Sequence, residues 1–513
     1  MKGGLYEKIL KIRKINIWHY FGNTKSEWMK KSGVQEQSPA PTMVMKSSKF
    51  FRINENLLVD NYLHMQFRIL LLVIFFQLGN IVNLVAQEKL TLNECINFAL
   101  KNNLQLQEEG MNQDLAALNY RQSRWNMLPS IGAGSDVGKN FGRSVDPATN
   151  SYVNTAFFNN SYYLGASVDL FRGFMYQNQV RYRAFKKEAS ENNRLNAADD
   201  LAFEVMNAFF NVIYFEELLK IANDQKALSE LNVKKTEILV STGLKSPTDL
   251  LEVKANFEKE ELFCLQTSTN ILTSWISLKK AMNLPPERQI TLQLPEPEQA
   301  SAGIPSTVQE LFAQHALRSP YIKSFEGEWK ASQKSVSISK GGFSPSILLQ
   351  ATYNTGFYET NKNADNQVIS FRDQINYNQR QFLGATLTIP LFSKNAVRFD
   401  VQSAKIAEDQ ARTRLNLARQ TLLYEMERNY NELTASAKEL QQAERQMEAD
   451  QLAFQAAQKR FDQGMINAIE LYTTKNRLAN TSAQVLHSKL TYAVKRRIVE
   501  FYKGNRFWEQ GKS

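Results

Sequence analysis

The sequence is poor in the residue types that build most active sites. Its 513 residues include two cysteines, Cys95 and Cys264, which are too few for a disulfide framework. His315 and His487 fall in predicted helices, and neither has a companion cysteine or a paired carboxylate motif. The sequence contains no phosphate-binding glycine loop, no G-x-S-x-G motif and no zinc-ligand spacing. We therefore predict no enzyme activity, no metal site and no cofactor.

Long hydrophobic runs are also missing, and the one candidate lies near the start of the chain. Arg68 precedes the apolar run 69–76, which continues to Ala86 with polar interruptions. A cation, an apolar segment and a small residue at its end are typical of a secretory signal peptide. We predict residues 65–86 as this signal, with cleavage after Ala86. The alternative, an N-terminal membrane anchor, requires a longer uninterrupted apolar run.

The positive charge of the chain resides mainly in the segment up to this signal. The formal net charge is +11, and residues 1–68 contain 12 Lys or Arg against 5 Asp or Glu. We therefore predict no nucleic-acid partner for the rest of the chain. Because a signal peptide begins a protein, residues 1–64 are interpreted as an extension from a start codon assigned too early, with translation beginning at Met65 or Met45. A long leader is the alternative interpretation.

Proline is absent from residues 394–463, where apolar side chains recur at every seventh position. The series is Met426, Leu433, Leu440, Met447, Phe454 and Phe461. The segment 221 residues earlier carries the matching series Val205, Val212, Leu219, Lys226, Val233 and Val240, with one interruption at the lysine. A sustained apolar period of seven is typical of a coiled coil. An ordinary core helix is the alternative, but the matching register in two places favours the coiled coil.

These two segments predict helices of about 65–70 residues, which are about 100 Å long at 1.5 Å per residue. Shorter helices are predicted on either side of them, at about 91–127, 248–284, 307–341 and 468–503. Each has about half the length of a long helix. Two of them could therefore stack end to end alongside one long helix.

The segments between the helices alternate between apolar and polar or small residues. Residues 162–170 and 383–389 show this alternation, as do residues 131–137 and 347–353. A soluble sheet with one buried face fits the pattern. A lipid-facing sheet also fits it, but must close on itself because open edges leave backbone groups unpaired in hydrocarbon. Four strands cannot enclose a pore, whereas three chains would supply twelve.

Two loops between the strands, at about 141–160 and 355–379, are rich in Asn, Thr, Ser and aromatic residues. Such a composition fits the long outer loops of a membrane barrel. The predicted aromatic residues at the membrane interface are Phe157, Phe158, Phe357 and Tyr358.

Landmarks in the first half of the chain return in the same order in the second half. Leu128-Pro129-Ser130-Ile131 returns as Ser344-Pro345-Ser346-Ile347, and Leu164-Gly165-Ala166 returns as Leu383-Gly384-Ala385. The number of residues between a landmark and its counterpart changes only slightly along the chain, and the order of the landmarks is preserved. This pattern indicates an internal duplication. We predict a single unit, 87–513, because neither repeat can bury its helical seam alone. It comprises a first repeat 87–284, a proline-rich linker 285–306, a second repeat 307–503 and a tail 504–513.

Four short motifs carry a resemblance to a known family. Leu170-Phe171-Arg172-Gly173 and Pro390-Leu391-Phe392-Ser393 resemble the Pro-Leu-Phe-x-Gly strand exit of the TolC-type outer-membrane efflux channels of Gram-negative bacteria. Gly243-Leu244 with Asp249-Leu250, and Gly464-Met465 with Glu470-Leu471, resemble the two helix turns of that family. The ordered set occurs twice, so the resemblance extends over essentially the whole of 87–513.

The resemblance implies a mixed α+β membrane protein that assembles as a homotrimer in the outer membrane. A twelve-stranded β-barrel, formed by strands within about 130–171 and 345–392, would contact outer-membrane lipid. It would continue into a long coiled-coil α-helical barrel across the periplasm. The implied function is a passive conduit of a tripartite efflux or secretion system, docked to a periplasmic membrane fusion (adaptor) protein and through it to an inner-membrane pump or exporter.

The resemblance places the periplasmic tip, the pore aperture and the adaptor contact at the two turns. The predicted site residues are Gly243, Leu244, Asp249, Leu250, Gly464, Met465, Glu470, Leu471 and Thr473. The second turn departs from the family pattern, because Phe461 and Ile466 replace a tyrosine and an arginine that would form a latch. Thr473 replaces a second acidic constriction residue. We therefore expect Glu470 to form the charged ring, in which three carboxylates would favour cations. Capping of the helix ends is the direct structural role of the two glycines.

Two other classes of protein fit part of this pattern. A periplasmic adaptor protein also carries a coiled-coil hairpin, but normally one hairpin flanked by the halves of a single β domain. A purely structural periplasmic coiled coil needs no strand pairs. The alternation of two hairpins with two strand pairs favours the channel over both.

Overall fold

A computed structural model describes residues 88–146, 150–294 and 307–509 of the chain. All of them belong to one unit, Ala86–Ser513. The predicted signal peptide 65–86 and the extension before it lie outside the described residues. None of the helices in the described ranges has an apolar stretch long enough to cross a membrane.

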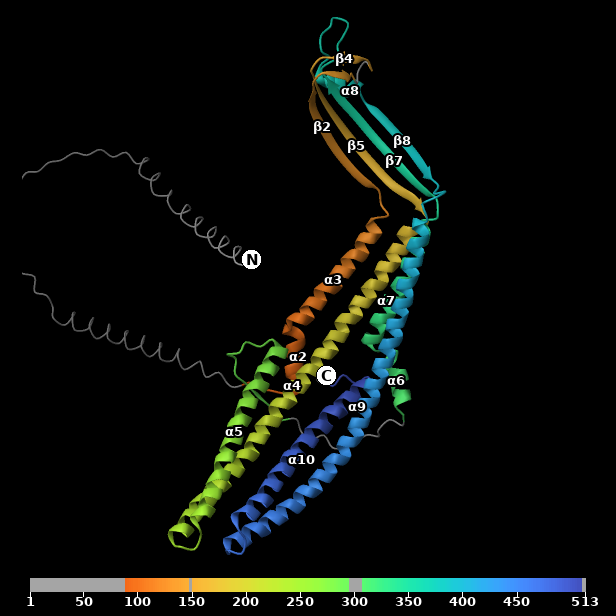
Figure 1. Cartoon of the computed structure of the whole chain (residues 1–513). Helices are drawn as coiled ribbons and strands as arrows, with labels where there is room; N and C mark the ends of the chain where they lie inside the picture. The colour runs from red at the N-terminus through yellow and green to blue at the C-terminus, as the bar shows by residue number, and fades with distance from the viewer. Residues whose placement is uncertain (1–87, 147–149, 295–306, 510–513) are drawn as a thin grey trace, which may run out of the picture. The chain divides into compact units, whose positions relative to one another are not determined.

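Two helices of equal length dominate the structure (Figure 1). α4 (Met175–Ser241) and α9 (Ala396–Asp462) each contain 67 residues, and both ends of α9 follow those of α4 by 221 positions. The predicted long helices are therefore confirmed. Each begins after two residues in the left-handed conformation, Gly173-Phe174 before α4 and Lys394-Asn395 before α9. The predicted strand-exit motifs thus lead the chain from a strand directly into a long helix.

Two of the predicted shorter helices are broken by local capping residues. Residues 91–127 form α2 (Leu92–Asn102) and α3 (Leu104–Trp125), because Asn103 ends the first helix and caps the second. Its side chain accepts a hydrogen bond from Leu106 N at 3.0 Å. Residues 307–341 form α6 (Val308–Ala316) and α7 (Pro320–Gly341), since Pro320 suits the first turn of a helix but cannot continue the preceding one.

The other two shorter helices, α5 (Pro247–Met282) and α10 (Ala468–Tyr502), are continuous. α3 and α5 lie along α4, while α7 and α10 lie along α9 (Figure 1). α7 and α10 also contact α4, so they lie between the two long helices. This arrangement confirms the expected placement of two short helices beside each long one. α3 and α5 form one lateral edge of the helical layer, and α9 forms the other.

The most buried row of each long helix differs from the predicted apolar series. Only three members of the predicted series in α9, Met426, Leu433 and Phe461, are buried. A second row at the same spacing is buried throughout: Leu422, Asn429, Ser436, Ala443, Asp450 and Ala457. The buried members of the matching row in α4 are Leu201, Ala208, Ala222, Ser229 and Thr236. The small side chains in these rows allow close helix packing, so the sequence predicted the period but only half of the seam.

The four long strands form one antiparallel sheet in the order β2-β5-β7-β8. They are β2 (Ser130–Asn140), β5 (Phe157–Arg172), β7 (Ser346–Tyr358) and β8 (Arg380–Thr388). β2–β5 and β7–β8 are the two predicted strand pairs, and the pairing of β5 with β7 joins the two halves of the chain. Within the described residues, β2 and β8 each keep one unpaired edge.

The strand register places the predicted apolar residues on one face of the sheet, called here the apolar face. Ile131, Ala166, Ala351 and Leu383 are direct partners across all four strands. The next row, on the opposite or polar face, contains Gly132, Gly165, Thr352 and Phe382. Directly paired residues point to the same face of a sheet, and successive residues point to opposite faces. The sheet is therefore two-sided, with glycine and polar residues dominating one side.

The two predicted outer loops contain further elements. β3 (Arg143–Val145) and β4 (Tyr152–Asn154) form a hairpin in the first loop, and α8 (Phe371–Tyr377) lies in the second. Two of the predicted interface aromatics, Phe158 and Phe357, lie on the apolar face with ring centroids 6.2 Å apart. The prediction is wrong for Phe157 and Tyr358, because they are the sequence neighbours of those residues and point to the polar face.

The linker and the tail both contact the first half of the chain. β6 (Ile290–Leu292), within the predicted linker, pairs in parallel with β1 (Glu88–Leu90). Trp508 of the tail is buried in a cluster that includes residues of α4, and Arg506 pairs with Asp199 of α4 at 3.0 Å. Residues 295–306 lie outside the described part of the chain.

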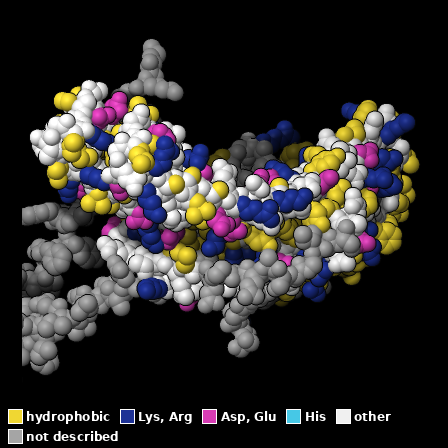
Figure 2. Space-filling view, turned by 90° about the horizontal axis from the view of Figure 1, so that it is seen from below, with side chains coloured by type: hydrophobic (Ala, Val, Ile, Leu, Met, Phe, Trp, Pro, Cys, Tyr) yellow, Lys and Arg dark blue, Asp and Glu magenta, His cyan; other side chains and the backbone are white. Residues whose placement is uncertain are grey.

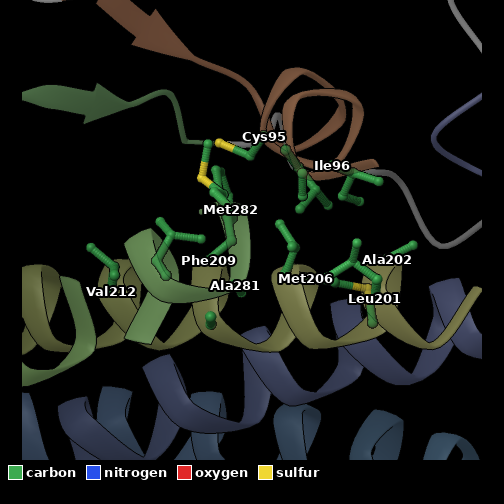
Figure 3. Packing of buried hydrophobic residues seen from close by; sticks show 14 of the residues in the cluster. Cys95, Ile96, Leu201, Ala202, Met206, Phe209, Val212, Ala281 and Met282 are labelled. Carbon is green, nitrogen blue, oxygen red and sulfur yellow. The ribbon is translucent and has the colours of Figure 1, made fainter. Parts of the chain in front are cut away.

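The main hydrophobic cluster lies where α2 and α5 pack against α4 (Figure 3). Cys95 of α2, Met206 and Phe209 of α4, and Met282 of α5 are fully buried there. Full burial of one such side chain contributes about 1.5–3 kcal/mol. Cys95 and Cys264 are both free and buried, and burial raises the pKa of the Cys95 thiol to about 12. This cluster therefore joins α2 and α5 to α4.

Candidate functional site

The first helix turn joins α4 to α5 and presents an apolar side chain to solvent. Gly243 adopts φ +74°, and Leu244 N donates a hydrogen bond to Leu239 O at 2.8 Å. This bond closes the end of α4 in the manner of a left-handed glycine cap, which confirms the structural role predicted for Gly243. Leu244 is 73% exposed. The turn therefore offers an apolar tip.

Asp249 has a local structural role at the start of α5. Its carboxylate accepts a hydrogen bond from Ser246 N at 3.2 Å, while the Ser246 hydroxyl accepts one from Thr248 N at 3.1 Å. Pro247 occupies the first helical position, which requires no backbone donor. Leu250 is half-buried. Asp249 therefore caps the helix rather than standing free at the tip.

The second turn, between α9 and α10, repeats this geometry. Gly464 adopts φ +75°, and Met465 N donates to Arg460 O at 2.8 Å. Met465 is exposed like Leu244. The carboxylate of Glu470 accepts a hydrogen bond from the Arg460 guanidinium at 3.2 Å, and both side chains are about half exposed. Arg460 thus offsets part of the negative charge that the sequence placed at this tip.

Two predicted site residues lie differently from the rest. Leu471 is completely buried in the cluster at the tips, so it supports the turn from inside and offers no surface to a partner. Thr473 is exposed, and its hydroxyl donates to Ile469 O at 2.8 Å within α10. The structure therefore brings the predicted residues to the two turns, but corrects Leu471 from a contact residue to a core residue.

The two tips touch each other through apolar and charged side chains. Phe461 and Ile466 are both buried in a cluster that also contains Val253 of α5. The Lys245 amino group lies 3.7 Å from the centroid of the Phe461 ring. Burial lowers the pKa of Lys245, and its Nζ has no hydrogen-bond partner. At the positions where the resemblance led us to look for a latch, the two turns are therefore joined by a cation–π contact and an apolar cluster.

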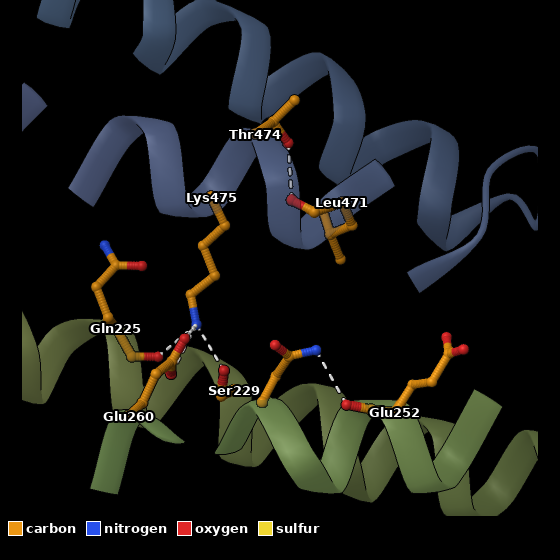
Figure 4. A network of polar contacts seen from close by, with 8 residues as sticks. Gln225, Ser229, Glu252, Glu260, Leu471, Thr474 and Lys475 are labelled. Carbon is orange, nitrogen blue, oxygen red and sulfur yellow. Dashed lines mark hydrogen bonds and ion pairs between the residues drawn. The ribbon is translucent and has the colours of Figure 1, made fainter. Parts of the chain in front are cut away.

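A buried lysine ties the hairpins together farther from the tips (Figure 4). The Lys475 amino group of α10 contacts both carboxylate oxygens of Glu260 in α5, at 2.8 and 3.0 Å. It also donates to Ser229 Oγ at 2.6 Å and to Gln225 O at 2.7 Å, both in α4. Its side chain is 1% exposed, and burial lowers its pKa. This network spans three helices and resists separation of the hairpins.

The sequence interpretation missed Lys475, although a signal for it existed. Lys475 lies four residues after Leu471 and seven after Ala468, both of which are buried on α10. A charged residue within an apolar stripe is rarely buried without a partner. The pattern could therefore have indicated a buried ion pair, but its partner, Glu260, lies 215 residues away and cannot be identified from local spacing.

A cavity of about 450 Å³ lies where α10 ends and α7 begins, between α4 and α9. Its lining includes Asp199, His315 and Tyr502. His315 Nδ1 is 3.2 Å from Tyr502 O, and burial lowers the pKa of His315 to about 4. Burial raises the pKa of Asp199 to about 6, against the opposing effect of the paired Arg506. No cluster of three or more potential metal ligands occurs in the part of the chain that the structure describes.

The surface carries charges of both signs. On the face shown in Figure 2, Lys and Arg side chains alternate with Asp and Glu and with hydrophobic groups. Exposed large hydrophobic residues also occur along α3 and α5, for example Met111, Leu115 and Leu272. This distribution indicates further packing surfaces rather than one strongly charged binding patch.

The sequence matches a family model described as "Outer membrane efflux protein" over residues 95–284 and 311–502. The outer membrane protein TolC of Vibrio cholerae serotype O1 is 22% identical over 431 residues, which cover 83% of this chain and 92% of that protein. The two matched segments of the family model include both long helices, both helix turns and all four strands of the large sheet.

Solved structures show a similar fold. A structure of CusC, described in terms of folding and transmembrane channel formation, matches with a TM-score of 0.70 at 16% identity, covering 80% of this chain and 91% of that chain. The outer membrane protein VceC from Vibrio cholerae matches with a TM-score of 0.68 at 15% identity, covering 80% and 95%. At these identities the likeness concerns the fold alone.

Proposed function

The chain belongs to the outer membrane efflux protein family, and on this basis we propose that three copies of it form a passive conduit through the outer membrane and the periplasm. Family membership confirms the predicted outer-membrane location and the prediction that the protein is not an enzyme. It also favours the channel over the adaptor alternative. The trimer, the twelve-stranded barrel and the partners are inferences from the following features.

The unpaired edges of the four-stranded sheet carry the proposal. A sheet in hydrocarbon must satisfy every backbone donor and acceptor, so β2 and β8 each need a partner strand. Because the sheet is antiparallel with an even number of strands, β8 of one copy can pair with β2 of the next in the same antiparallel sense. Such a head-to-tail contact closes into a ring when repeated. Three copies would give twelve strands.

The helical layer has matching unpaired edges. α3 leads into β2, and it exposes an apolar row at the edge of the layer. The row consists of Leu104, Met111, Leu115, Leu118 and Trp125. α9 follows β8 at the opposite edge and exposes Phe399, Ile406, Leu417 and Tyr424. These rows support coiled-coil packing between neighbouring copies.

The two faces of the sheet support its orientation in such a barrel. We infer that the apolar face contacts lipid, while the polar face, with Gly134, Tyr163 and Asn354 in one row, lines the channel. The equal lengths of α4 and α9 support an internal duplication, with 87–284 and 307–503 as its repeats. The whole of 87–513 then acts as one protomer.

The helix turns are the proposed contact with a periplasmic adaptor protein and, through it, with an inner-membrane pump or exporter. Leu244 and Met465 are both exposed at the tips, where they would offer apolar groups to the adaptor. Gly243 and Gly464 shape these turns through their left-handed conformation.

We propose that the Glu470 side chains of the three copies form a charged ring at the aperture. Its carboxylate is about half exposed beside Arg460, so three copies would place three carboxylates and three guanidinium groups around the axis. Glu470→Gln should reduce the preference of the channel for cations, whereas Thr473→Val, one turn away, should not. Reversal potentials in planar bilayers measure this preference. An unchanged reversal potential in Glu470→Gln would exclude Glu470 from the ion path.

The first experiment on the assembly is to express residues 65–513 in a Gram-negative host and weigh the detergent-solubilised protein by light scattering. We expect an outer-membrane species with three times the protomer mass. Met111→Asp in the apolar row of α3 should reduce this mass, whereas Asn112→Asp adds the same charge beside the row and should not. A monomer in the soluble periplasmic fraction would overturn the proposal, and an intact trimer of Met111→Asp would refute the role of this row.

A further inference from the structure

A short helix covers the part of β7 that β8 does not reach. β7 extends to Tyr358, whereas β8 begins at Arg380, which pairs with Asn354. Residues 355–358 pair with β5 on one side only. On the other side α8 packs against β7, at the end of the sheet far from the long helices (Figure 1). α8 therefore takes the place of a strand.

Gln374 of α8 makes the hydrogen bonds that a neighbouring strand would make. Its Oε1 accepts from Tyr358 N at 2.9 Å, and its Nε2 donates to Tyr358 O at 3.0 Å. The same Nε2 donates to Ile369 O at 2.9 Å, and the side chain of Asn378 donates to Gly356 O at 2.7 Å. Gln374 is buried, with both ends of its amide engaged. These bonds hold α8 in a defined position on β7.

α8 lies on the apolar face of the sheet. Thr355, which pairs with Tyr162 on this face, donates from its hydroxyl to Ile375 O of α8 at 2.6 Å. The Phe371 ring lies 6.4 Å from the Tyr162 ring and 5.7 Å from the Phe357 ring. Tyr162 and Phe357 belong to the same face by register. The aromatic residues at the end of the apolar face thus continue onto α8.

The outer surface of α8 is aromatic and polar. Arg372, Asn376 and Tyr377 are exposed, and Tyr377 is 82% exposed. Phe371 is half-exposed beside them. Tyrosine and arginine combine an apolar body with a polar end, which suits the boundary between hydrocarbon and water. Gln374 holds the side of α8 that faces β7, so the opposite, exposed side of the helix is free to contact its surroundings.

We propose that α8 lies among the lipid head groups of the outer leaflet and sets the height of the sheet in the membrane. The proposal rests on the proposed function, because it takes the apolar face to be the lipid-facing side. Aromatic girdles lie at both edges of the apolar band of membrane barrels, and the row of Phe158, Phe357 and Phe371 ends this band here. The partner of the exposed side of α8 is therefore the lipid surface, since α8 continues the face of the sheet that lipid would cover.

Spin labels at three positions test this depth. Tyr377→Cys probes α8, Leu164→Cys probes the apolar face within β5, and Tyr152→Cys probes the exposed β3–β4 hairpin. The protein is labelled with a nitroxide and reconstituted in phosphatidylethanolamine–phosphatidylglycerol vesicles. Collision rates with oxygen, which partitions into lipid, are compared with those of a water-soluble nickel chelate. The unsubstituted protein gives the background, because Cys95 and Cys264 are buried.

We expect Leu164→Cys to favour oxygen, Tyr152→Cys to favour the nickel chelate, and Tyr377→Cys to lie between them. A value for Tyr377→Cys equal to that of Tyr152→Cys would place α8 in water and overturn the proposal. Shielding from both probes would place α8 against a neighbouring subunit and also overturn it. A water-like value for Leu164→Cys would instead overturn the membrane orientation of the proposed function.

Gln374→Ala tests whether these bonds position the helix. Added to Tyr377→Cys, it should increase the mobility of the nitroxide and its exposure to the nickel chelate, because α8 loses its bonds to Tyr358. Asn376→Ala on the exposed side is the control and should leave both values unchanged. Equal spectra for the two variants would show that Gln374 does not hold α8.

Discussion

The strongest predicted effect on the hairpins comes from removal of the Lys475 amino group. Lys475→Ala leaves Glu260, Ser229 and the carbonyl of Gln225 without their shared partner. Removing one partner of a buried ion pair costs about 3–5 kcal/mol. The Glu260 side chain is 15% exposed and retains some hydration, which places the expected loss near the lower end of this range. We therefore expect a loss of about 3 kcal/mol in the free energy of unfolding.

Lys254 provides a matched control, because it occupies the position 221 residues before Lys475. It pairs with Glu237 at 2.9 Å, and both side chains are about half exposed. Exposed ion pairs contribute about 0–1 kcal/mol, so Lys254→Ala should have little effect. Replacing both buried partners, as in Lys475→Met with Glu260→Leu, should recover most of the loss because no unpaired charge remains.

Urea unfolding followed by far-UV circular dichroism, at equal protein concentration, measures these differences. Single-channel conductance in planar bilayers tests the consequence for the tips, since separation of the hairpins should increase conductance in Lys475→Ala alone. Equal loss of stability in Lys475→Ala and Lys254→Ala would refute the reasoning from burial. A destabilised Lys475→Ala protein with unchanged conductance would refute the link between this contact and the proposed aperture.

Three further effects follow from backbone conformation and burial. Gly464→Ala should lower the free energy of unfolding by about 1–2 kcal/mol, because a residue with a side chain must then adopt φ +75°, although nothing lies close to the added carbon. Gly173→Ala should lower it further, since the added carbon would also collide with Gly341 O. Equal melting temperatures of the two variants would contradict this order. Burial lowers the pKa of His315 from 6.5 to about 4, so the folded state binds fewer protons between these values and stability should fall by about 3 kcal/mol as pH drops through this window. His315→Gln should remove this part of the pH dependence, which is measured by comparing melting temperatures at pH 7 and pH 4.5. The raised pKa of Asp199 has the opposite effect on stability, but Asp199 is present in both proteins and therefore does not affect the comparison. Cys95 should react with a maleimide only after unfolding, because its thiol is buried and its pKa is about 12, and rapid labelling of the native protein would contradict its placement in the core.

Local patterns in the sequence determined the main elements of this protein. Apolar spacing of seven, the absence of proline and the two glycines at the turns predicted α4, α9 and both hairpins. Alternation of two predicted the four long strands, because side chains on a strand must face opposite sides. The same local rules could have predicted the break at Pro320 and excluded Phe157 and Tyr358 from the apolar face of the sheet. These properties depend on neighbouring residues, which is why the sequence contains them.

Contacts between distant segments were decided only by the tertiary structure. The amino group of Lys475 is buried because α10 packs against α4 and α5, and its bonds reach residues 215 to 250 positions away. Gln374 substitutes for a strand only because β8 begins beside Asn354 and leaves the last residues of β7 without a neighbouring strand. The burial of Leu471 and the buried row from Leu422 to Ala457 likewise depend on which helix lies alongside. Periodicity shows that one side of a helix will be covered, whereas the partner that covers it is set by packing across the whole fold.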